Sequence, residues 1–179
     1  MSDKVHLVLG GARSGKSRFA EQIAIDSGKD VIYMATATIY DNEMQQRINR
    51  HIEDRPSHWL TIEEPLLLAQ ALQQYSTENT CILVDCLTLW LTNVLMAEQE
   101  DAIQGQSFFE VNKEKLLQTL VSLPGQVILV SNEVGQGIVP MGELSRRFVD
   151  EAGWLHQDIA RIAQQVTLVV AGLPMQLKN

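Results

Sequence analysis

The sequence is poor in cysteine, in aromatic residues and in basic side chains. It has only two cysteines, Cys81 and Cys86, with no histidine nearby, so we expect reduced thiols and neither a disulfide framework nor a zinc site. The 14 Lys and Arg against 22 Asp and Glu leave a net charge of −8, which offers no long-range attraction for nucleic acid. No apolar stretch approaches the roughly 20 residues that span a bilayer, and the N-terminus lacks the features of a signal peptide. We therefore expect a cytoplasmic protein without a membrane span.

Hydrophobic residues make up 45 % of the 179 positions, which is enough for one folded domain covering residues 1–179. Short apolar runs without alternation are typical of strands covered on both faces, and they alternate with stretches of helical spacing. This pattern predicts an α/β fold with a mostly parallel central sheet and helices on both faces. We expect strands at residues 5–9, 31–35, 81–84, 127–131 and 166–171, and helices at 17–27, 41–52, 65–75, 87–97, 108–123 and 144–164. The polar segment 97–106 is expected to be a surface loop.

The strongest local signal is a match to the phosphate-loop pattern G-x-x-x-x-G-K-[ST], placed between a predicted strand and a predicted helix. Glycines allow the backbone to curl around a polyphosphate with N–H groups pointing inward, and the helix dipole adds positive potential. In such a loop Lys16 reaches the β- and γ-phosphates and the Ser17 hydroxyl ligates Mg²⁺. The pattern occupies Gly10, Gly11, Ala12, Arg13, Ser14, Gly15, Lys16 and Ser17.

An acidic residue, Asp85, ends the apolar run 81–84. In phosphate-loop enzymes a carboxylate at this place holds the Mg²⁺ shell, although Asp also caps helices that follow strands. After the run 127–131 the chain reads Asn132-Glu133-Val134-Gly135, which is not the guanine-reading motif of GTPase switches. The residues alone therefore indicate a small phosphotransferase that uses Mg²⁺ and a nucleoside triphosphate.

His51 lies among three arginines, Arg47, Arg50 and Arg55. Neighbouring guanidinium groups favour the neutral imidazole and bind phosphate oxygens, and a neutral imidazole nitrogen is a nucleophile. His51 could accordingly accept a nucleotidyl group covalently. It also shares a helical face with Met44 and Ile48, so a histidine facing the core is the alternative.

With these motifs, the chain closely resembles the bifunctional adenosylcobinamide kinase / adenosylcobinamide-phosphate guanylyltransferase family of cobalamin biosynthesis. The resemblance covers essentially the whole chain. The segments around His51 and at 132–140 are more specific to the family than the phosphate loop. The motifs that carry it are residues 10–17, 33–37, 41–51, 55–59, 85–93 and 132–140.

The resemblance implies a RecA-like phosphate-loop fold, a homo-oligomer expected to be a trimer, and two reactions. ATP or GTP phosphorylates adenosylcobinamide, and GTP then passes GMP through a histidine to adenosylcobinamide phosphate, giving adenosylcobinamide-GDP. His51 matches the guanylylated histidine. Residues that match nucleotide-binding positions are the phosphate loop 10–17 together with Ala35, Thr36, Ala37, Ile52, Glu53, Asp54, Arg55, Glu63 and Asp85.

Several assignments stay open at this stage. Glu133 could act as a base toward the cobinamide hydroxyl or be a carboxylate in a surface turn. Trp59 and Trp90 fit a core or an interface better than a platform for the corrin. His156 stands where the family tends to have Asn. Two other functions compete with this one: a small-molecule kinase without nucleotidyl transfer, and a regulatory module that only senses nucleotide.

Overall fold

The computed structural model describes residues 4–38, 56–100 and 107–179. A seven-stranded sheet runs through these residues, and helices follow most of its strands. The strands are β1 (Val5–Gly10), β2 (Asp30–Ala35), β3 (Leu60–Glu63), β4 (Thr80–Asp85), β5 (Gln126–Asn132), β6 (Gln165–Val170) and β7 (Leu173–Lys178). The helices are α1 (Lys16–Asp26), α3 (Leu68–Tyr75), α4 (Leu87–Glu100), α5 (Phe108–Ser122) and α6 (Glu143–Ile162).

The strand order is β3-β2-β4-β5-β1-β6-β7, and every pair is parallel except β6 with β7. The predicted α/β fold with a mostly parallel sheet is confirmed. In the register of the ladders, Gly10 lies opposite Asn132 and Ala35 lies opposite Asp85. Parallel strands bring their carboxyl ends to one edge, so the segments that follow β1, β2, β4 and β5 meet there.

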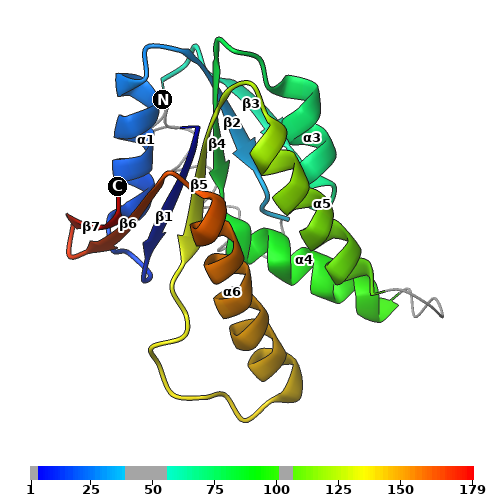
Figure 1. Cartoon of the computed structure of the whole chain (residues 1–179). Helices are drawn as coiled ribbons and strands as arrows, with labels where there is room; N and C mark the ends of the chain where they lie inside the picture. Colours follow the sequence, from blue (N-terminus) through cyan, green and yellow to red (C-terminus); the bar gives the residue numbers. More distant parts are fainter. Residues whose placement is uncertain (1–3, 39–55, 101–106) are drawn as a thin grey trace.

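Each face of the sheet has its own apolar core. Alternate side chains of the central strands, such as Leu7 and Val84, pack with α3, α4, α5 and α6 in the larger cluster. The intervening ones, such as Val8 and Leu83, pack with Ala20 and Ala24 of α1. Figure 1 shows α1 on one side of the sheet and α3 to α6 on the other. The expected burial of the strands on both faces is therefore confirmed.

Two strands were missed by the sequence reading, and both lie at the edges of the sheet. The residues of β3 are mostly exposed, and those of β7 are exposed throughout, so neither shows a continuous apolar run. Pro174 fits in β7 because an edge strand needs hydrogen bonds on one side only. Strand formation here depends on a neighbouring strand with free backbone groups, which local composition does not reveal.

The predicted loop at 97–106 is wrong for its first part, because α4 continues to Glu100. Glu98 explains the extension: its Oε1 accepts the backbone N–H of Phe109 at 3.0 Å and also bonds the hydroxyl of Ser107, while its Oε2 pairs with Arg147 of α6. The last turn of α4 is thereby tied to two other helices. Residues 101–106 and the predicted helix 41–52 lie outside the described residues.

The buried aromatic residues agree with a core assignment. Trp90 is 1 % exposed and its indole Nε1–H donates to the Leu66 carbonyl at 2.9 Å, and Trp59 is 8 % exposed. Cys81 and Cys86 are both buried, free thiols. Among the residues of ranges 4–38, 56–100 and 107–179, no helix has the length and apolar character needed to cross a membrane.

Candidate functional site

The phosphate-loop sequence forms a curled connection between β1 and α1. Arg13 with φ 56° and Gly15 with φ 94° adopt left-handed backbone conformations, and Ser14 N–H closes the turn onto the Gly11 carbonyl at 3.3 Å. A side chain at Gly10 would collide with Ser14 Oγ and lie 2.8 Å from the Val169 carbonyl oxygen. The glycines at positions 10 and 15 are therefore required by close approach and by backbone conformation.

Lys16 opens α1 at the base of this loop, and the residue is only 9 % exposed. Its Nζ donates to the Gly11 carbonyl at 3.1 Å, which folds the ammonium over the loop. Burial lowers the pKa of Lys16, and the negative charge of Asp85 opposes that shift. A desolvated ammonium is a strong partner for phosphate oxygens.

Asp85 ends β4 at the same edge of the sheet as Gly10 ends β1. Its Oδ2 accepts the hydroxyl of Tyr33, on the neighbouring strand β2, at 2.9 Å. This hydrogen bond engages one carboxylate oxygen and so orients the group from β2. The peptide bond between Asp85 and Cys86 is cis.

Thr36 links the ends of β2 and β4. Its side chain is fully buried, and Oγ1 donates to the Cys86 carbonyl at 2.7 Å while accepting the Cys86 N–H at 2.9 Å. Its carbonyl accepts the side-chain amide of Asn93 at 2.8 Å. The hydroxyl of Thr36 thus holds the backbone directly after Asp85.

The other predicted nucleotide positions divide into two groups. Ala35 and Glu63 are paired neighbours at the ends of β2 and β3; Glu63 is exposed there and Ala37 is half-buried just beyond β2. The structure therefore brings the phosphate loop, the ends of β2 and β3, and Asp85 to one edge of the sheet. The remaining positions, His51, Ile52, Glu53, Asp54 and Arg55, lie outside the described residues.

The end of β5 completes this edge next to the phosphate loop. Glu133 N–H donates to the Gly10 carbonyl at 3.0 Å, and the Glu133 carboxylate accepts the N–H of Gly135 at 2.9 Å. The contact with Gly135 fits one alternative for Glu133, a carboxylate in a turn. The other alternative, a base toward the cobinamide hydroxyl, stays a prediction. Two residues before Glu133, Ser131 Oγ is 2.7 Å from Nε2 of His156. Burial lowers the pKa of His156, partly offset by Glu133.

Several positioning residues escaped the sequence reading. Tyr33, Asn93 and the pair Ser131 and His156 act through contacts between residues more than 20 positions apart. Tyr33 and Asn93 lie inside motifs that carry the family resemblance, and their place in those motifs is the signal that could have identified them. Nothing local assigned them a partner, because the partners meet only when the strands pair.

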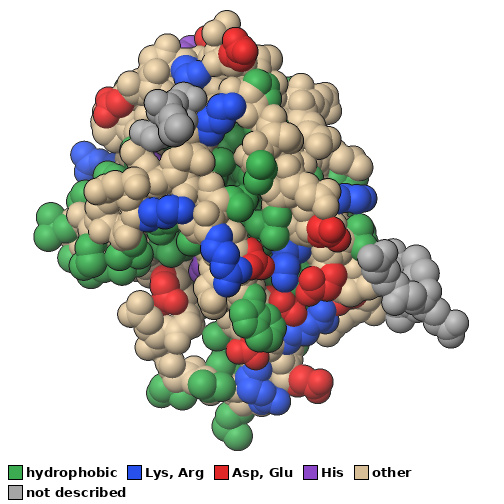
Figure 2. Space-filling model, viewed as in Figure 1, with side chains coloured by type: hydrophobic (Ala, Val, Ile, Leu, Met, Phe, Trp, Pro, Cys, Tyr) green, Lys and Arg blue, Asp and Glu red, His purple; other side chains and the backbone are tan. Residues whose placement is uncertain are grey.

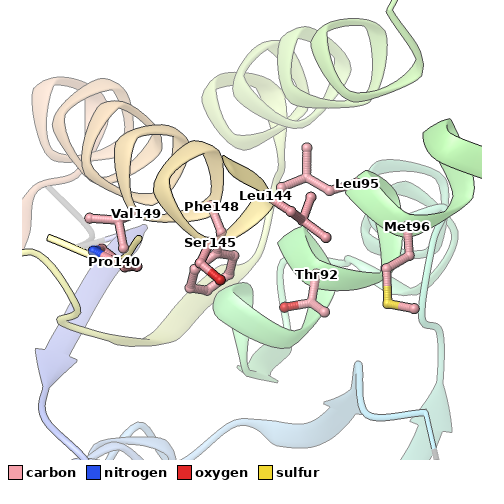
Figure 3. A pocket seen from close by; sticks show the side chains of 8 residues that line it. All are labelled: Thr92, Leu95, Met96, Pro140, Leu144, Ser145, Phe148 and Val149. Atoms are coloured by element: carbon pink, nitrogen blue, oxygen red, sulfur yellow. The ribbon is translucent and has the colours of Figure 1, made fainter. Parts of the chain in front are cut away.

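A separate cavity of about 280 Å³ lies between α4 and the start of α6. In Figure 3, Thr92, Leu95 and Met96 of α4 face Leu144, Ser145 and Phe148 of α6 across it. Its lining is mostly apolar, and Pro140 and Val149 complete it. Of the predicted nucleotide-binding residues that the structure describes, none lines this cavity.

Comparison with known proteins places this geometry in a family. Residues 6–177 match the model of the cobinamide kinase / cobinamide phosphate guanyltransferase family. The bifunctional adenosylcobalamin biosynthesis protein CobP of Pseudomonas aeruginosa is 56 % identical over 173 residues, covering 97 % of this chain and 96 % of the relative. The corresponding protein CobU of Escherichia coli is 39 % identical over 179 residues, with 96 % and 98 % covered.

Solved structures support the fold independently. The RadB recombinase superposes with a TM-score of 0.52 at 16 % identity, covering 93 % of this chain and 74 % of that chain. An ATPase of a bacterial type III secretion system gives a TM-score of 0.58 at 10 % identity, covering 93 % and 52 %. These likenesses confirm the RecA-like architecture. With the family match over nearly the full length, the chain belongs to the cobinamide kinase / cobinamide phosphate guanyltransferase family, whose members are transferases of adenosylcobalamin biosynthesis.

Proposed function

We propose that the protein carries out two successive transfers with nucleotides bound at the carboxyl edge of its sheet, as a single domain of residues 1–179. In the first, ATP or GTP gives its γ-phosphoryl group to the hydroxyl of adenosylcobinamide. In the second, GTP gives GMP to adenosylcobinamide phosphate, producing adenosylcobinamide-GDP. The observation that carries the proposal is the buried Lys16 ammonium over the curled loop 10–17, within the electrostatic influence of Asp85.

In this proposal the phosphate loop binds the triphosphate through its backbone N–H groups and Lys16. Lys16 exchanges its bond to the Gly11 carbonyl for bonds to phosphate oxygens. The neighbouring ends of β2 and β3, with Ala35, Ala37 and Glu63, contact the nucleoside. Thr36 acts by holding the backbone after Asp85, since its hydroxyl is engaged with Cys86 in both directions.

Ser17 and Asp85 are the residues that would hold Mg²⁺. A hydroxyl and a carboxylate are hard oxygen donors of the kind this ion prefers, and the bond from Tyr33 engages only Oδ2 of Asp85. When bound, the ion supplies charge neutralisation on the triphosphate. The loop and Lys16 meanwhile align the γ-phosphorus with the attacking hydroxyl.

His51 is the proposed nucleophile of the guanylyl transfer. Its neutral imidazole nitrogen attacks the α-phosphorus of GTP, a P–N bond forms, and the bond to pyrophosphate breaks. A phosphate oxygen of adenosylcobinamide phosphate then attacks the same phosphorus, and the P–N bond breaks to regenerate the imidazole. Arginines 47, 50 and 55 supply positive charge along the same segment, and Ile52 to Arg55 contact the nucleotide by the family resemblance.

Labelling with GTP tests this mechanism. Protein incubated with α-labelled GTP and Mg²⁺ should acquire an acid-labile, alkali-stable label that is absent in His51→Ala and lost in Lys16→Ala. His58→Ala is the matched control, because His58 is an exposed histidine seven positions along, and it should label normally. Label that persists in His51→Ala contradicts the assignment. Transfer of only the γ-phosphoryl group to cobinamide supports a simple kinase, and binding without turnover supports a regulatory module.

We also propose that the protein acts in the cytoplasm as a homo-oligomer, a trimer by resemblance to the family. Exposed apolar side chains support self-association: Ile138 is 98 % and Met141 96 % exposed in the loop before α6, and Leu173 of β7 is 72 % exposed. Figure 2 shows apolar side chains gathered over β6 and β7 and at the tip of that loop. Light scattering after gel filtration should give three times the 20.0 kDa chain mass; the mass of one chain refutes the trimer.

A further inference from the structure

The turn between β6 and β7 touches the phosphate loop from outside. The N–H of Gly172 donates to the Ser14 carbonyl at 2.7 Å. A Cβ added to Gly15 would lie 3.1 Å from Gly172 Cα and 3.9 Å from Val169 Cγ1. The backbone of the loop is therefore packed directly against the C-terminal hairpin, although more than 150 residues separate them.

The hairpin holds its donor in place by its own geometry. Val170 pairs with Leu173, so Ala171 and Gly172 alone form the connection. Both have positive φ, 52° and 78°, as two-residue hairpin turns with the right-handed twist of strands require. Beyond the turn, the paired strands β6 and β7 fix the position of the Gly172 N–H.

Anchoring the Ser14 carbonyl has a direct consequence for Gly15. In a trans peptide the C=O and the following N–H lie in one rigid plane and point in opposite directions. With the carbonyl bonded to the hairpin, the Gly15 N–H must point away from it, toward the inner side of the loop. Backbone N–H groups at this place in a phosphate loop are those that bind the α- and β-phosphates.

We propose that the backbone N–H of Gly172 is a positioning group for the triphosphate, which acts by orienting the Gly15 N–H in advance of nucleotide binding. This inference rests on the proposed function of the loop 10–17. The hairpin itself touches no substrate in this role. Its contribution lies in avoiding a rotation of the Ser14–Gly15 peptide that the nucleotide would otherwise have to impose.

The most selective perturbation is an amide-to-ester replacement that puts glycolic acid in place of Gly172, which replaces the N–H donor by an oxygen and leaves every side chain unchanged. We expect the Kd of a non-hydrolysable GTP analogue with Mg²⁺ to rise about tenfold, which corresponds to one hydrogen bond of about 1.4 kcal/mol. The Kd of guanosine, which has no phosphate group, should rise less than threefold. Gly172→Val provides a genetic version, because a β-branched residue rarely adopts positive φ and nothing within 4 Å of the added Cβ would clash.

Ala171→Asn is the matched control. Asn tolerates the left-handed conformation, and position 171 is exposed, so the turn and the triphosphate affinity should be preserved. A folded ester variant with unchanged affinity for the GTP analogue would overturn the inference, as would equal losses for the GTP analogue and guanosine. Lys16→Ala separates the two claims: if it leaves GTP affinity unchanged, the proposed function fails, and if it abolishes affinity while the ester variant binds normally, only the role of the turn fails.

Discussion

Replacing Thr36 by Val should show how much the two hydrogen bonds between Thr36 and Cys86, which join the ends of β2 and β4, contribute to the free energy of unfolding. Valine has nearly the same shape as threonine but cannot bond the N–H and C=O of Cys86, which Thr36 Oγ1 contacts at 2.9 Å and 2.7 Å. Because Thr36 and Cys86 are both buried, water cannot replace these bonds. An unsatisfied buried backbone group costs about 1–3 kcal/mol, so we expect a loss of about 2–4 kcal/mol in the free energy of unfolding.

Thr36→Ser is the matched control, since it keeps the hydroxyl and removes one methyl group. Deletion of a buried methyl costs about 1 kcal/mol, so Ser should be the less destabilising substitution. Urea denaturation followed by fluorescence measures both variants, with the m-value compared to verify the same two-state transition. Because Cys86 follows Asp85 directly, Val should also lower kcat more than Ser does.

The order of the two variants decides the argument. If Thr36→Ser destabilises the protein as much as Thr36→Val, packing and not hydrogen bonding is the contribution of Thr36. If the Thr36→Val variant unfolds at the same urea concentration as the wild type, the backbone of Cys86 does not need the hydroxyl of Thr36. Either result would refute the view that this side chain holds the end of β4.

Three further predictions concern charged side chains that are buried or half-buried. Lys16→Met should abolish kinase turnover yet raise the free energy of unfolding by about 1 kcal/mol, because burial lowers the pKa of Lys16 and so penalises its charged form; a less stable folded variant would contradict this. Burial alone would raise the pKa of Glu98, but the hydrogen bonds from Ser107, Phe109 and Arg147 outweigh it, and the net shift is downward from 4.5. The stabilisation is therefore present at neutral pH and lost as pH falls through the folded-state pKa, so Glu98→Gln should cost about 1–3 kcal/mol at pH 7 and the difference from wild type should shrink in acid. Burial, with Glu110, raises the pKa of Glu151, whose Oε2 has no hydrogen-bond partner among residues 4–38, 56–100 and 107–179. The folded protein therefore favours the protonated carboxyl, and this contribution to stability is complete below pH 4.5 and is lost as pH rises through the folded-state pKa of Glu151. Glu151→Gln should be about 1 kcal/mol more stable than wild type at pH 7 in thermal or urea unfolding, and no more stable near pH 4.

The sheet illustrates what local patterns can predict. The five strands that were expected are those with apolar side chains on both faces, such as residues 81–84 within β4. Their burial is encoded in composition, because a strand covered on two sides must be apolar at nearly every position. The exposed edge strands β3 and β7 lack that property, and they form because a neighbour offers unpaired backbone groups.

The candidate site likewise has parts that local sequence patterns predict and parts that only the tertiary structure shows. By itself the sequence determined the phosphate loop, the acidic end of the strand at Asp85 and the family, since each is a contiguous pattern whose chemistry requires those residues at that spacing. Only the tertiary structure decided that Tyr33 holds Asp85, that Thr36 holds Cys86 and that Gly172 holds the loop through Ser14. These contacts join residues brought together by the order of strands in the sheet, and no local spacing in the chain specifies that order.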